Sequence, residues 1–331
     1  MEFTGGGRLT IRITPVDVGK RVSVRCLIGS GGGVEKFTDT VGVLTSWNEG
    51  VLLITRRTGE TVRIAESSLV AGKVAPAAPA RRRGPAADFE EVARVMARAW
   101  RPVESERLGE WELRASSGFT RRANSVLPLG DPGLPLDEAL THVRGWYEAR
   151  GLPAYVQTAT GAAGTQEELC AQLEARGWWS EVSAEVRIGA LAPVGDLETD
   201  VERVRLARSF DEAWLRRYQR SGTPGSHVLR VLGSGPSVWF ATVAGEGDAP
   251  AAIGRCVVDG RWAGFMAVEV DPAHRREGLA TSVMTALARR ALEEGASAAW
   301  LQVETDNDGA RALYDGMGFA IHHRYHHFRS A

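Results

Sequence analysis

Cysteine is scarce in this sequence, and the three that occur are far apart. They stand at Cys26, Cys170 and Cys256 and form no C-x-x-C pair. An odd number of isolated thiols fits a reducing compartment better than a disulfide framework, and the spacing offers no zinc site. We therefore expect a cytoplasmic protein without a metal.

Long apolar runs and an excess of either charge are also missing. No stretch of about 18 apolar residues occurs, so we expect no membrane-spanning helix. The opening residues, MEFTGGGRLTIRIT, lack a basic segment followed by an apolar one, and we expect no signal peptide. The formal net charge is −1, which gives the whole chain no electrostatic attraction to nucleic acid or to an anionic membrane.

What the sequence does contain is enough material for a multidomain globular protein. Its 331 residues, 44% of them hydrophobic, allow two or three domains. Only three of its 40 basic residues are lysines. With abundant glycine and alanine, this bias is typical of a GC-rich bacterial genome.

Short β-branched runs that alternate with turn residues fill the first 75 residues. Turn signals include Asp17-Val18-Gly19, the glycine run 29–33 and Asn48-Glu49-Gly50. This spacing predicts an all-β domain over residues 1–75, a small SH3-like barrel. Residues 76–88, rich in Ala and Pro, are predicted to be a linker. The expected strands cover 9–14, 21–28, 40–47, 51–57 and 61–65.

Two α/β regions follow, residues 89–190 and residues 196–331. Both alternate helical periodicity with strand-like runs, which predicts mixed sheets flanked by helices. In the first region we expect helices at 89–100 and 136–149 and strands at 111–117 and 154–160. In the second we expect strands at 238–244, 252–258 and 263–270, followed by a helix, a strand, a helix and a final strand.

The loop between the strand at 263–270 and the next helix favours anion binding. Gly278 and Ala280 let backbone amides approach a phosphate closely, and the helix dipole adds about half a positive charge behind them. Arg275 and Arg276 add donors at the rim. A tight strand-to-helix turn would also favour small residues, so the loop alone leaves both interpretations open.

A second motif lies further along the chain and decides between them. Asn307 to Phe319 follows the pattern N-x-x-A-x-x-L-Y-x-x-x-G-F, and the earlier loop follows V-x-P-x-x-R-x-x-G-x-A with Asp271 as its second residue. In this order and at this spacing, the two motifs resemble the GCN5-related N-acetyltransferase (GNAT) superfamily. The resemblance covers about 120 residues and implies acetyl-CoA as the co-substrate.

The resemblance implies a role for each matching residue. The Val268 amide would stabilise the oxyanion, Asn307 would bind the pantetheine and Tyr314 would protonate the leaving thiolate. An aromatic on a buried helix face is more often core, but the motif around Tyr314 favours the catalytic interpretation. The backbone of Val268, Glu269 and Val270 would pair with the pantetheine arm. The pyrophosphate would lie on Arg275, Arg276, Glu277, Gly278, Leu279, Ala280 and Thr281.

The general base is left open by the sequence. Many family members place a Glu four residues before the oxyanion amide, where this chain has Gly264. Glu269, Glu304 and a chain of waters are alternatives. The C-terminal run IHHRYHHFR (321–329) holds four of the seven histidines, and an imidazole could accept the amine proton.

The region 89–190 resembles a damaged copy of the same module. Its loop has Gly130 or Asp131 at the arginine position and Pro135, which has no N–H, in place of the small residue. Trp178 stands near the end of the second motif, and no tyrosine precedes it. We expect this copy not to bind acetyl-CoA and to shape the active cleft. The arrangement is similar to mycothiol synthase and to bacterial tandem acetyltransferases with an SH3-like domain, some labelled histone-type.

The sequence therefore predicts an N-acetyltransferase acting on a primary amine, in a small molecule or a protein lysine. The alternative is a non-catalytic protein that senses acetyl-CoA or another ligand on the same scaffold. The barrel has few aromatics, Phe3, Phe37 and Trp47, too few for a stacking platform for nucleic acid. We expect it to dock a partner or to form an oligomer. The acceptor is not specified by any motif.

Overall fold

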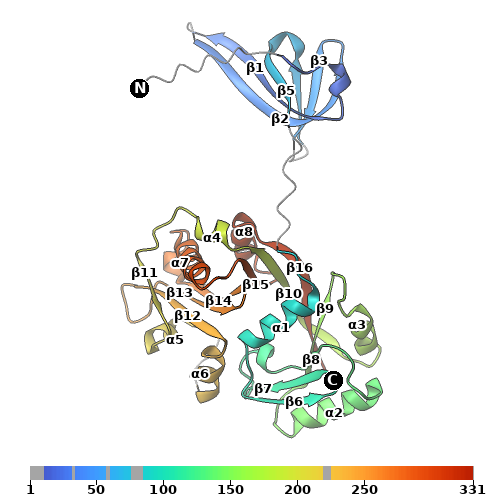
Figure 1. The fold of residues 1–331 in the computed structure, drawn as a ribbon, viewed down its shortest axis with the longest axis vertical. Coiled ribbons are helices and arrows are strands. Elements are labelled where there is room, and N and C mark those ends of the chain that lie inside the picture. Colours follow the sequence, from blue (N-terminus) through green and yellow to red (C-terminus); the bar gives the residue numbers. More distant parts are fainter. Residues whose placement is uncertain (1–10, 32–33, 57–59, 76–84, 219–224, 331) are drawn as a thin grey trace. The chain divides into compact units, whose positions relative to one another are not determined.

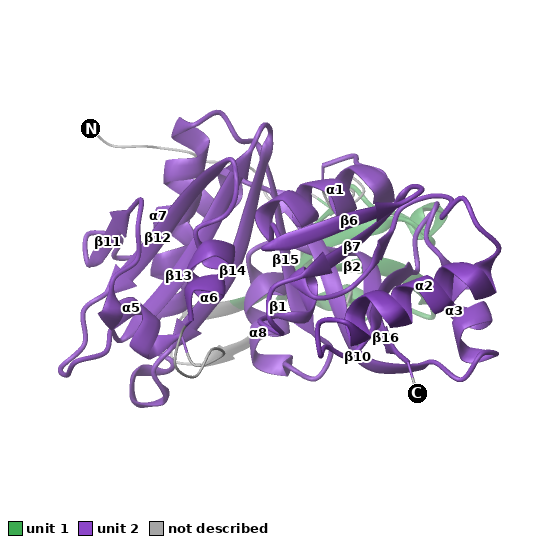
Figure 2. Cartoon of the chain, turned by 90° about the horizontal axis from the view of Figure 1, so that it is seen from below, with its two compact units in different colours: residues 1–82 green, residues 83–331 purple. Residues whose placement is uncertain are grey.

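The computed structural model describes residues 11–31, 34–56, 60–75, 85–218 and 225–330 (Figure 1). The chain divides into two compact units, residues 1–82 and residues 83–331, coloured separately in Figure 2. Most of the predicted linker 76–88 lies outside the described residues. Within the described ranges, no helix is long and apolar enough to cross a bilayer.

The first unit is an antiparallel five-stranded sheet in the order β4-β3-β2-β1-β5. Val22, Val24, Leu44, Leu52 and Ile54 alternate along their strands with outward residues and form its core, as expected for sheets with one buried face. The strands are β1 (Arg21–Gly31), β2 (Val34–Asn48), β3 (Val51–Thr55), β4 (Thr61–Ala65) and β5 (Leu69–Val74), with 3-10 turns η1 (Pro15–Asp17) and η2 (Glu66–Ser68).

One strand of this unit was not predicted from the sequence, and one expected strand is only partly described. Strand β5 was not expected, since Ala71-Gly72 weakens its strand signal. The expected strand at 9–14 lies partly outside the described residues, and Ile11 forms an isolated bridge with Gly72. Among the described residues β4 and β5 are not paired with each other, so the sheet is open and the SH3-like barrel stays a prediction.

The second unit is built on one mixed sheet of eight strands, in the order β11-β12-β13-β14-β15-β10-β16-β9. Its strands are β9 (Tyr155–Thr160), β10 (Trp179–Ala190), β11 (Val204–Ala207), β12 (Ser237–Val243), β13 (Ala252–Asp259), β14 (Trp262–Val270), β15 (Ala298–Glu304) and β16 (Ala320–Arg329). A smaller sheet contains β6 (Glu104–Leu108), β7 (Trp111–Ala115) and β8 (Leu127–Pro128).

The two α/β regions seen in the sequence share the large sheet. Strand β10, from the first region, lies between β15 and β16 of the second, and β16 pairs in turn with β9. The regions at 89–190 and 196–331 are therefore joined by continuous strand pairing. Local sequence patterns could not predict this exchange, because it is decided by which strand edges meet.

Helices cover both faces of the large sheet. On one face, Val283, Met284 and Leu287 of α7 pack with Tyr314 and Met317 around α8. On the other face, apolar residues of α1, α5 and α6 pack against Val257 and Trp300. The helices are α1 (Phe89–Ala99), α2 (Leu136–Glu148), α3 (Glu167–Glu174), α4 (Ala192–Gly195), α5 (Glu212–Arg217), α6 (Ser226–Leu232), α7 (Leu279–Glu293) and α8 (Asp308–Gly316), with 3-10 turns η3 (Arg121–Ala123) and η4 (Pro272–His274).

A buried arginine in β13 fixes the end of α1 against the sheet. Arg255 Nε donates to Leu232 O at 2.7 Å, and its Nη2 donates to Ala99 O at 2.9 Å. Its guanidinium also lies 4.9 Å from the centre of the Trp100 ring. Burial lowers the pKa of Arg255 to about 10, which leaves it charged at neutral pH. The contacts hold Trp100 at the cavity described below.

Candidate active site

Two parallel strands diverge where the sequence predicts the cofactor arm. β14 and β15 pair from Trp262 and Ala298 to Phe265 and Leu301, and no further. Beyond Phe265, Ala267 has φ 52° and the β13–β14 register shifts, which together mark a β-bulge. A bulge re-aims the backbone that follows it, and the residue that follows here is Val268, the predicted oxyanion donor.

The loop after β14 is anchored at its start. The Asp271 carboxylate accepts the Ala273 amide at 2.9 Å and pairs with the guanidinium of Arg217. The Ala273 hydrogen bond and the Arg217 charge keep the pKa of Asp271 below its ordinary value. Arg217 is itself buried and donates through Nε to Pro250 O at 2.7 Å. The aspartate therefore ties the loop to the protein interior.

The rest of the loop forms the start of α7. Arg276 and Gly278 both have left-handed φ, 71° and 77°, and Gly278 is the N-cap of the helix. An added Cβ at Gly278 would find no atom within 4 Å, so the position opens onto free space. The first three amides of a helix have no intrahelical acceptor. Leu279, Ala280 and Thr281 carry those amides here, as an anion cradle requires.

Asn307 and Tyr314 lie at the two ends of α8. Asn307 caps the helix, with Oδ1 accepting the Ala310 amide at 3.1 Å, which leaves the side-chain NH₂ as the group to meet a ligand. Tyr314 is only 9% exposed, and its ring meets Phe319 edge-on at 6.1 Å. Both the packing and the catalytic interpretations of Tyr314 are therefore compatible with its position.

One cavity of about 510 Å³ brings several predicted residues together. Val268, Glu269, Asn307 and Tyr314 line it, whereas Val270 and the loop 275–281 do not. From the sequence we expected the first α/β region to shape the cleft, but sequence reasoning named none of the residues of that part of the wall, because this stretch carries no motif. That part consists of Trp100, Phe119, Thr120, Arg121, Arg122 and Val182.

The structure gives a physical reason for glycine at position 264. A Cβ on Gly264 would lie 2.3 Å from Cζ2 of Trp300, so the indole occupies the space that a glutamate would need. The carboxylates that do line the cavity are Glu269, on β14, and Glu304, at the end of β15.

The histidines of β16 fall on both sides of that strand. His326 lies between Ser183 Oγ, at 2.7 Å, and Thr160 Oγ1, at 2.8 Å, and His327 lines the cavity. Burial, aided by Arg324, lowers the pKa of His326. Burial and the neighbouring arginines hold the pKa of His327 well below its ordinary value. Both rings are therefore weak proton acceptors at neutral pH.

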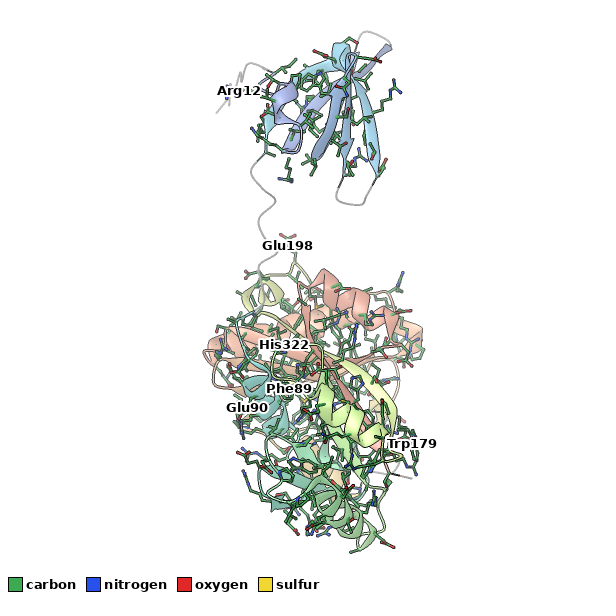
Figure 3. The ribbon with its side chains drawn as sticks, turned by 90° about the vertical axis from the view of Figure 1, so that its right-hand side faces the viewer. Arg12, Phe89, Glu90, Trp179, Glu198 and His322 are labelled. Carbon is green, nitrogen blue, oxygen red and sulfur yellow. The ribbon has the colours of Figure 1, made fainter. Side chains whose placement is uncertain are left out.

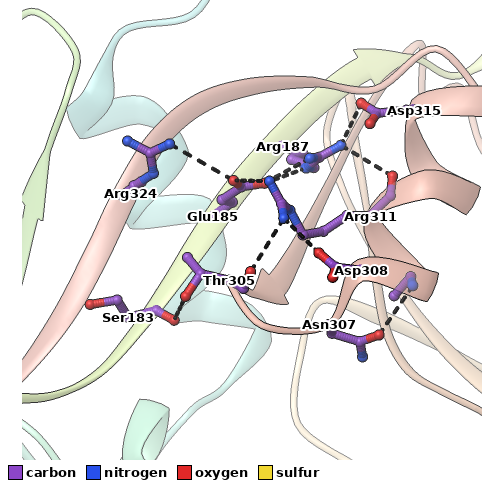
Figure 4. A network of polar contacts seen from close by, with 10 residues as sticks. Ser183, Glu185, Arg187, Thr305, Asn307, Asp308, Arg311, Asp315 and Arg324 are labelled. Carbon is purple, nitrogen blue, oxygen red and sulfur yellow. Dashed lines mark hydrogen bonds and ion pairs between the residues drawn. The ribbon is translucent and has the colours of Figure 1, made fainter.

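A charged network connects β10 to α8 (Figure 4). The side chains of Arg187 and Glu185 are 2% and 1% exposed, and they pair at 2.7 Å. Arg187 also reaches Asp315 on α8 at 2.7 Å, and Arg311 Nη2 approaches Glu185 at 3.4 Å. Breaking a buried pair of this kind costs about 3–5 kcal/mol. The strand from the first region thus fixes the helix that carries Tyr314.

The corresponding loop of the first region is filled by its own carboxylates. Glu110 Oε2 accepts the Asp131 amide at 2.8 Å, and Asp131 Oδ1 accepts the Gly133 amide at 2.7 Å. A Cβ at Gly130 would lie 2.1 Å from Glu110 Oε2. Pro135 is the N-cap of α2. Acceptors of the protein thus already occupy amides that a diphosphate would need, and a second anion would be repelled.

Known proteins are similar to this chain in fold or in sequence. A GCN5-related N-acetyltransferase from Kribbella flavida matches with a TM-score of 0.55 at 16% identity, over 72% of this chain and 94% of that one. A tandem GNAT protein from the clavulanic acid biosynthesis pathway matches with a TM-score of 0.51 at 14% identity, over 75% of this chain and 89% of that one. The probable histone acetyltransferase Rv0428c of Mycobacterium tuberculosis is 26% identical over 307 residues, 92% of this chain and 93% of the relative.

These similarities place the chain in a class and in a family. The class is that of acyltransferases of the GNAT type. The family model described as probable histone acetyltransferase Rv0428c C-terminal matches residues 86–328, and the chain belongs to this family. The model of the Rv0428c N-terminal Sm-like domain matches residues 16–73.

Proposed function

We propose that this enzyme transfers the acetyl group of acetyl-CoA to a primary amine. The observation that carries the proposal is the bulged end of β14, with Val268 beyond the point where β14 and β15 part. Tyr314 and Asn307 line the same cavity as Val268. Acetyl-CoA requires a strand edge that can pair with its pantetheine arm and a helix N-terminus that can bind its diphosphate. It also requires a proton donor for the departing sulfur.

The residues that would hold acetyl-CoA come from three elements. Val268, Glu269 and Val270 would pair with the pantetheine, whose amide would also meet the Asn307 NH₂. The open space at Gly278 suits a diphosphate on the amides from Arg276 to Thr281, with Arg275 at the rim and Glu277 braced by His274, 3.3 Å away. When bound, acetyl-CoA supplies the activated acyl carbon.

Transfer would take place directly in a ternary complex. The amine nitrogen forms the new bond to the acyl carbon while the Val268 N–H stabilises the developing oxyanion, and the carbon–sulfur bond breaks. The Tyr314 hydroxyl gives its proton to the departing sulfur. The amine loses its proton to Glu269 or Glu304, the carboxylates that line the cavity, or to a chain of waters.

Two other parts of the chain have proposed supporting roles. The filled loop around Asp131 supports the idea that the first α/β region is a degenerate module that does not bind acetyl-CoA. Its contribution would be the cavity wall and the β10 brace on α8. For the N-terminal five-stranded domain, predicted from the sequence as an SH3-like barrel, we propose that it docks a partner or forms an oligomer. The acceptor would be a small-molecule amine or a protein lysine.

The test is Tyr314→Phe in an assay of CoA release. We expect kcat to fall by about 10²-fold with little change in KM for acetyl-CoA, because general acid catalysis contributes about 10²–10⁴-fold. Tyr147→Phe is the matched control, since its hydroxyl bonds Arg114 O at 2.9 Å outside the cavity. That variant should lose about 1 kcal/mol of stability and keep its kcat. Full activity in Tyr314→Phe would refute the acid assignment.

A further inference from the structure

The charged groups that line the cavity differ in sign between its parts. The negative side chains are those of Glu269 on β14 and Glu304 at the end of β15. The positive side chains are those of Arg121 and Arg122 on η3 of the first region. Burial depresses the pKa of His327, and the nearby guanidinium groups of Arg122, Arg114 and Arg121 depress it further. His327 thus lies in a positively charged part of the cavity wall.

Arg122 is the unusual member of this wall. Its Nη2 donates to the Tyr325 hydroxyl at 2.6 Å, and its guanidinium lies 6.0 Å and 5.7 Å from the centres of the Trp100 and Tyr325 rings. Its neighbour Arg121 pairs with Glu181 at 3.3 Å. For Arg122, the described part of the chain offers no carboxylate within 4.0 Å. A half-buried guanidinium among aromatic rings normally has an anionic partner.

This part of the cavity wall contains buried hydrogen-bond donors that have no acceptor among the described residues. Arg122 Nε and Trp100 Nε1 are buried, and neither has an acceptor among the described residues. Neither ring nitrogen of His327, which is 2% exposed, has a hydrogen-bond partner among the described residues, and its neutral ring offers one donor and one acceptor. Arginine and tryptophan can only donate. An unsatisfied buried donor costs about 1–3 kcal/mol, so this part of the wall is suited to a ligand group that accepts several hydrogen bonds.

We propose that the acceptor amine carries an anionic oxygen group, a carboxylate or a phosphate, which Arg122 binds while the amine faces Val268. This inference rests on the acetyl transfer proposed above and specifies its substrate class. The aromatic residues Phe119, Tyr218 and Tyr325 also line the cavity and suit an apolar body between the two ends. A basic peptide tail would bring positive charge to Arg122 and is disfavoured.

The test uses acceptor pairs that differ only in the anionic group. The carboxylate probes are glycine, 4-aminobutyrate, 6-aminohexanoate and phenylalanine, each compared with its primary amide. 2-Aminoethylphosphonate is compared with ethanolamine, and a lysine-rich peptide completes the set. We expect kcat/KM for the best anionic probe to exceed that of its neutral partner by about 10-fold or more, which is the scale of one charge-assisted hydrogen bond. Comparing the carboxylate probes with the phosphonate probe shows whether the site prefers a carboxylate or a phosphate group.

Variants show whether Arg122 is responsible. Arg122→Gln should remove the anionic preference, mainly through the KM of the acceptor, with acetyl-CoA binding unchanged. Arg122→Lys keeps the charge without the fork geometry and should retain part of the preference, which separates loss of charge from misfolding. Arg107→Gln, an exposed position on β6 outside the cavity, is the matched control and should behave as the unmodified enzyme.

Calorimetry of the CoA-saturated enzyme with the same probes separates this inference from acetyl transfer. Anionic probes that bind through Arg122 without CoA release for any amine would contradict acetyl transfer and support the anion site. Amines acetylated without any anionic preference, or a preference that survives in Arg122→Gln, would overturn the anion site and leave acetyl transfer intact. Failure of every anionic probe both to bind and to react would also overturn it.

Discussion

At the scale of single residues, hydrogen bonds define the protonation of two adjacent histidines. His322 Nε2 lies 3.0 Å from Ala87 O, so that nitrogen must carry the hydrogen. In the neutral ring Nδ1 is then an acceptor, and it lies 2.7 Å from His323 Nδ1, which must be the donor. His323 packs edge-on against Phe89 at 5.2 Å (Figure 3 labels Phe89 and His322). Burial and the neighbouring His322 lower the pKa of His323 to about 3.

Stability is therefore predicted to fall in mild acid. The unfolded chain takes up a proton at His323 below its ordinary pKa of about 6.5, while the folded chain does so only near 3. Stability is thus complete above pH 6.5 and is lost as the pH falls. His323 alone should cost about 2 kcal/mol between pH 7.5 and pH 5, and the lowered pKa values of His326 and His327 act in the same direction.

Urea unfolding at pH 7.5 and pH 5 measures this loss. His323→Gln should be less stable at pH 7.5 and should show a smaller difference between the two pH values. His142→Gln, at an exposed position, should leave the difference unchanged. Equal stability of the unmodified protein at both pH values would show that these imidazoles do not control its acid sensitivity.

At the scale of elements, α7 has a glycine in left-handed conformation at each end. Gly278 caps its N-terminus with φ 77°, and Gly295 follows its C-terminus with φ 90°. A Cβ at either position would find no atom within 4 Å. The two positions therefore carry similar backbone strain on substitution, and only Gly278 lies at the proposed diphosphate site.

This symmetry gives a matched pair of variants. Gly278→Ala and Gly295→Ala should each lose about 1 kcal/mol of stability, because an L side chain disfavours positive φ. Gly278→Ala should also raise KM for acetyl-CoA by about 10-fold or more, since its methyl group would enter the space beside the helix amides. Thermal melting and steady-state kinetics measure the two effects. An equal KM for both variants would place the diphosphate elsewhere.

At the scale of the whole molecule, the described wall of the cavity belongs to one of the two units. All its lining residues lie between Trp100 and His327, within residues 83–331. Both α/β regions contribute to it, because β10 is paired inside the large sheet. Chemistry on a small amine is therefore expected to need this unit in full, and not the N-terminal sheet.

Truncation tests this division. A chain of residues 83–331 should fold and keep kcat/KM for a small amine within about twofold of the 331-residue chain, since the cavity loses none of its described lining. Circular dichroism and the CoA-release assay measure the outcome. A large loss of activity in a folded fragment would show that residues 1–82 take part in the reaction with small amines.

Several elements and the motif residues could be predicted from the amino-acid sequence alone. Apolar periodicity predicted α7 and α8, and the resemblance carried by the motifs pointed to Val268, Asn307 and Tyr314, which line one cavity. Such features are local, because a helix period or a motif spacing involves neighbouring residues only. The missed strand β5 is the opposite case, since its small residues Ala71 and Gly72 form a strand only by pairing with β1.

The surroundings of those residues depend on tertiary packing and could not be predicted from the sequence. Trp300 occupies the space beside Gly264, burial weakens the histidines of β16 as bases, and η3 brings Arg122 to the cavity. Each depends on contacts between segments far apart in the chain, such as Arg122 with Tyr325. A sequence pattern records which residues are present, whereas burial and long-range packing set their charge, their partners and the ligand they can bind.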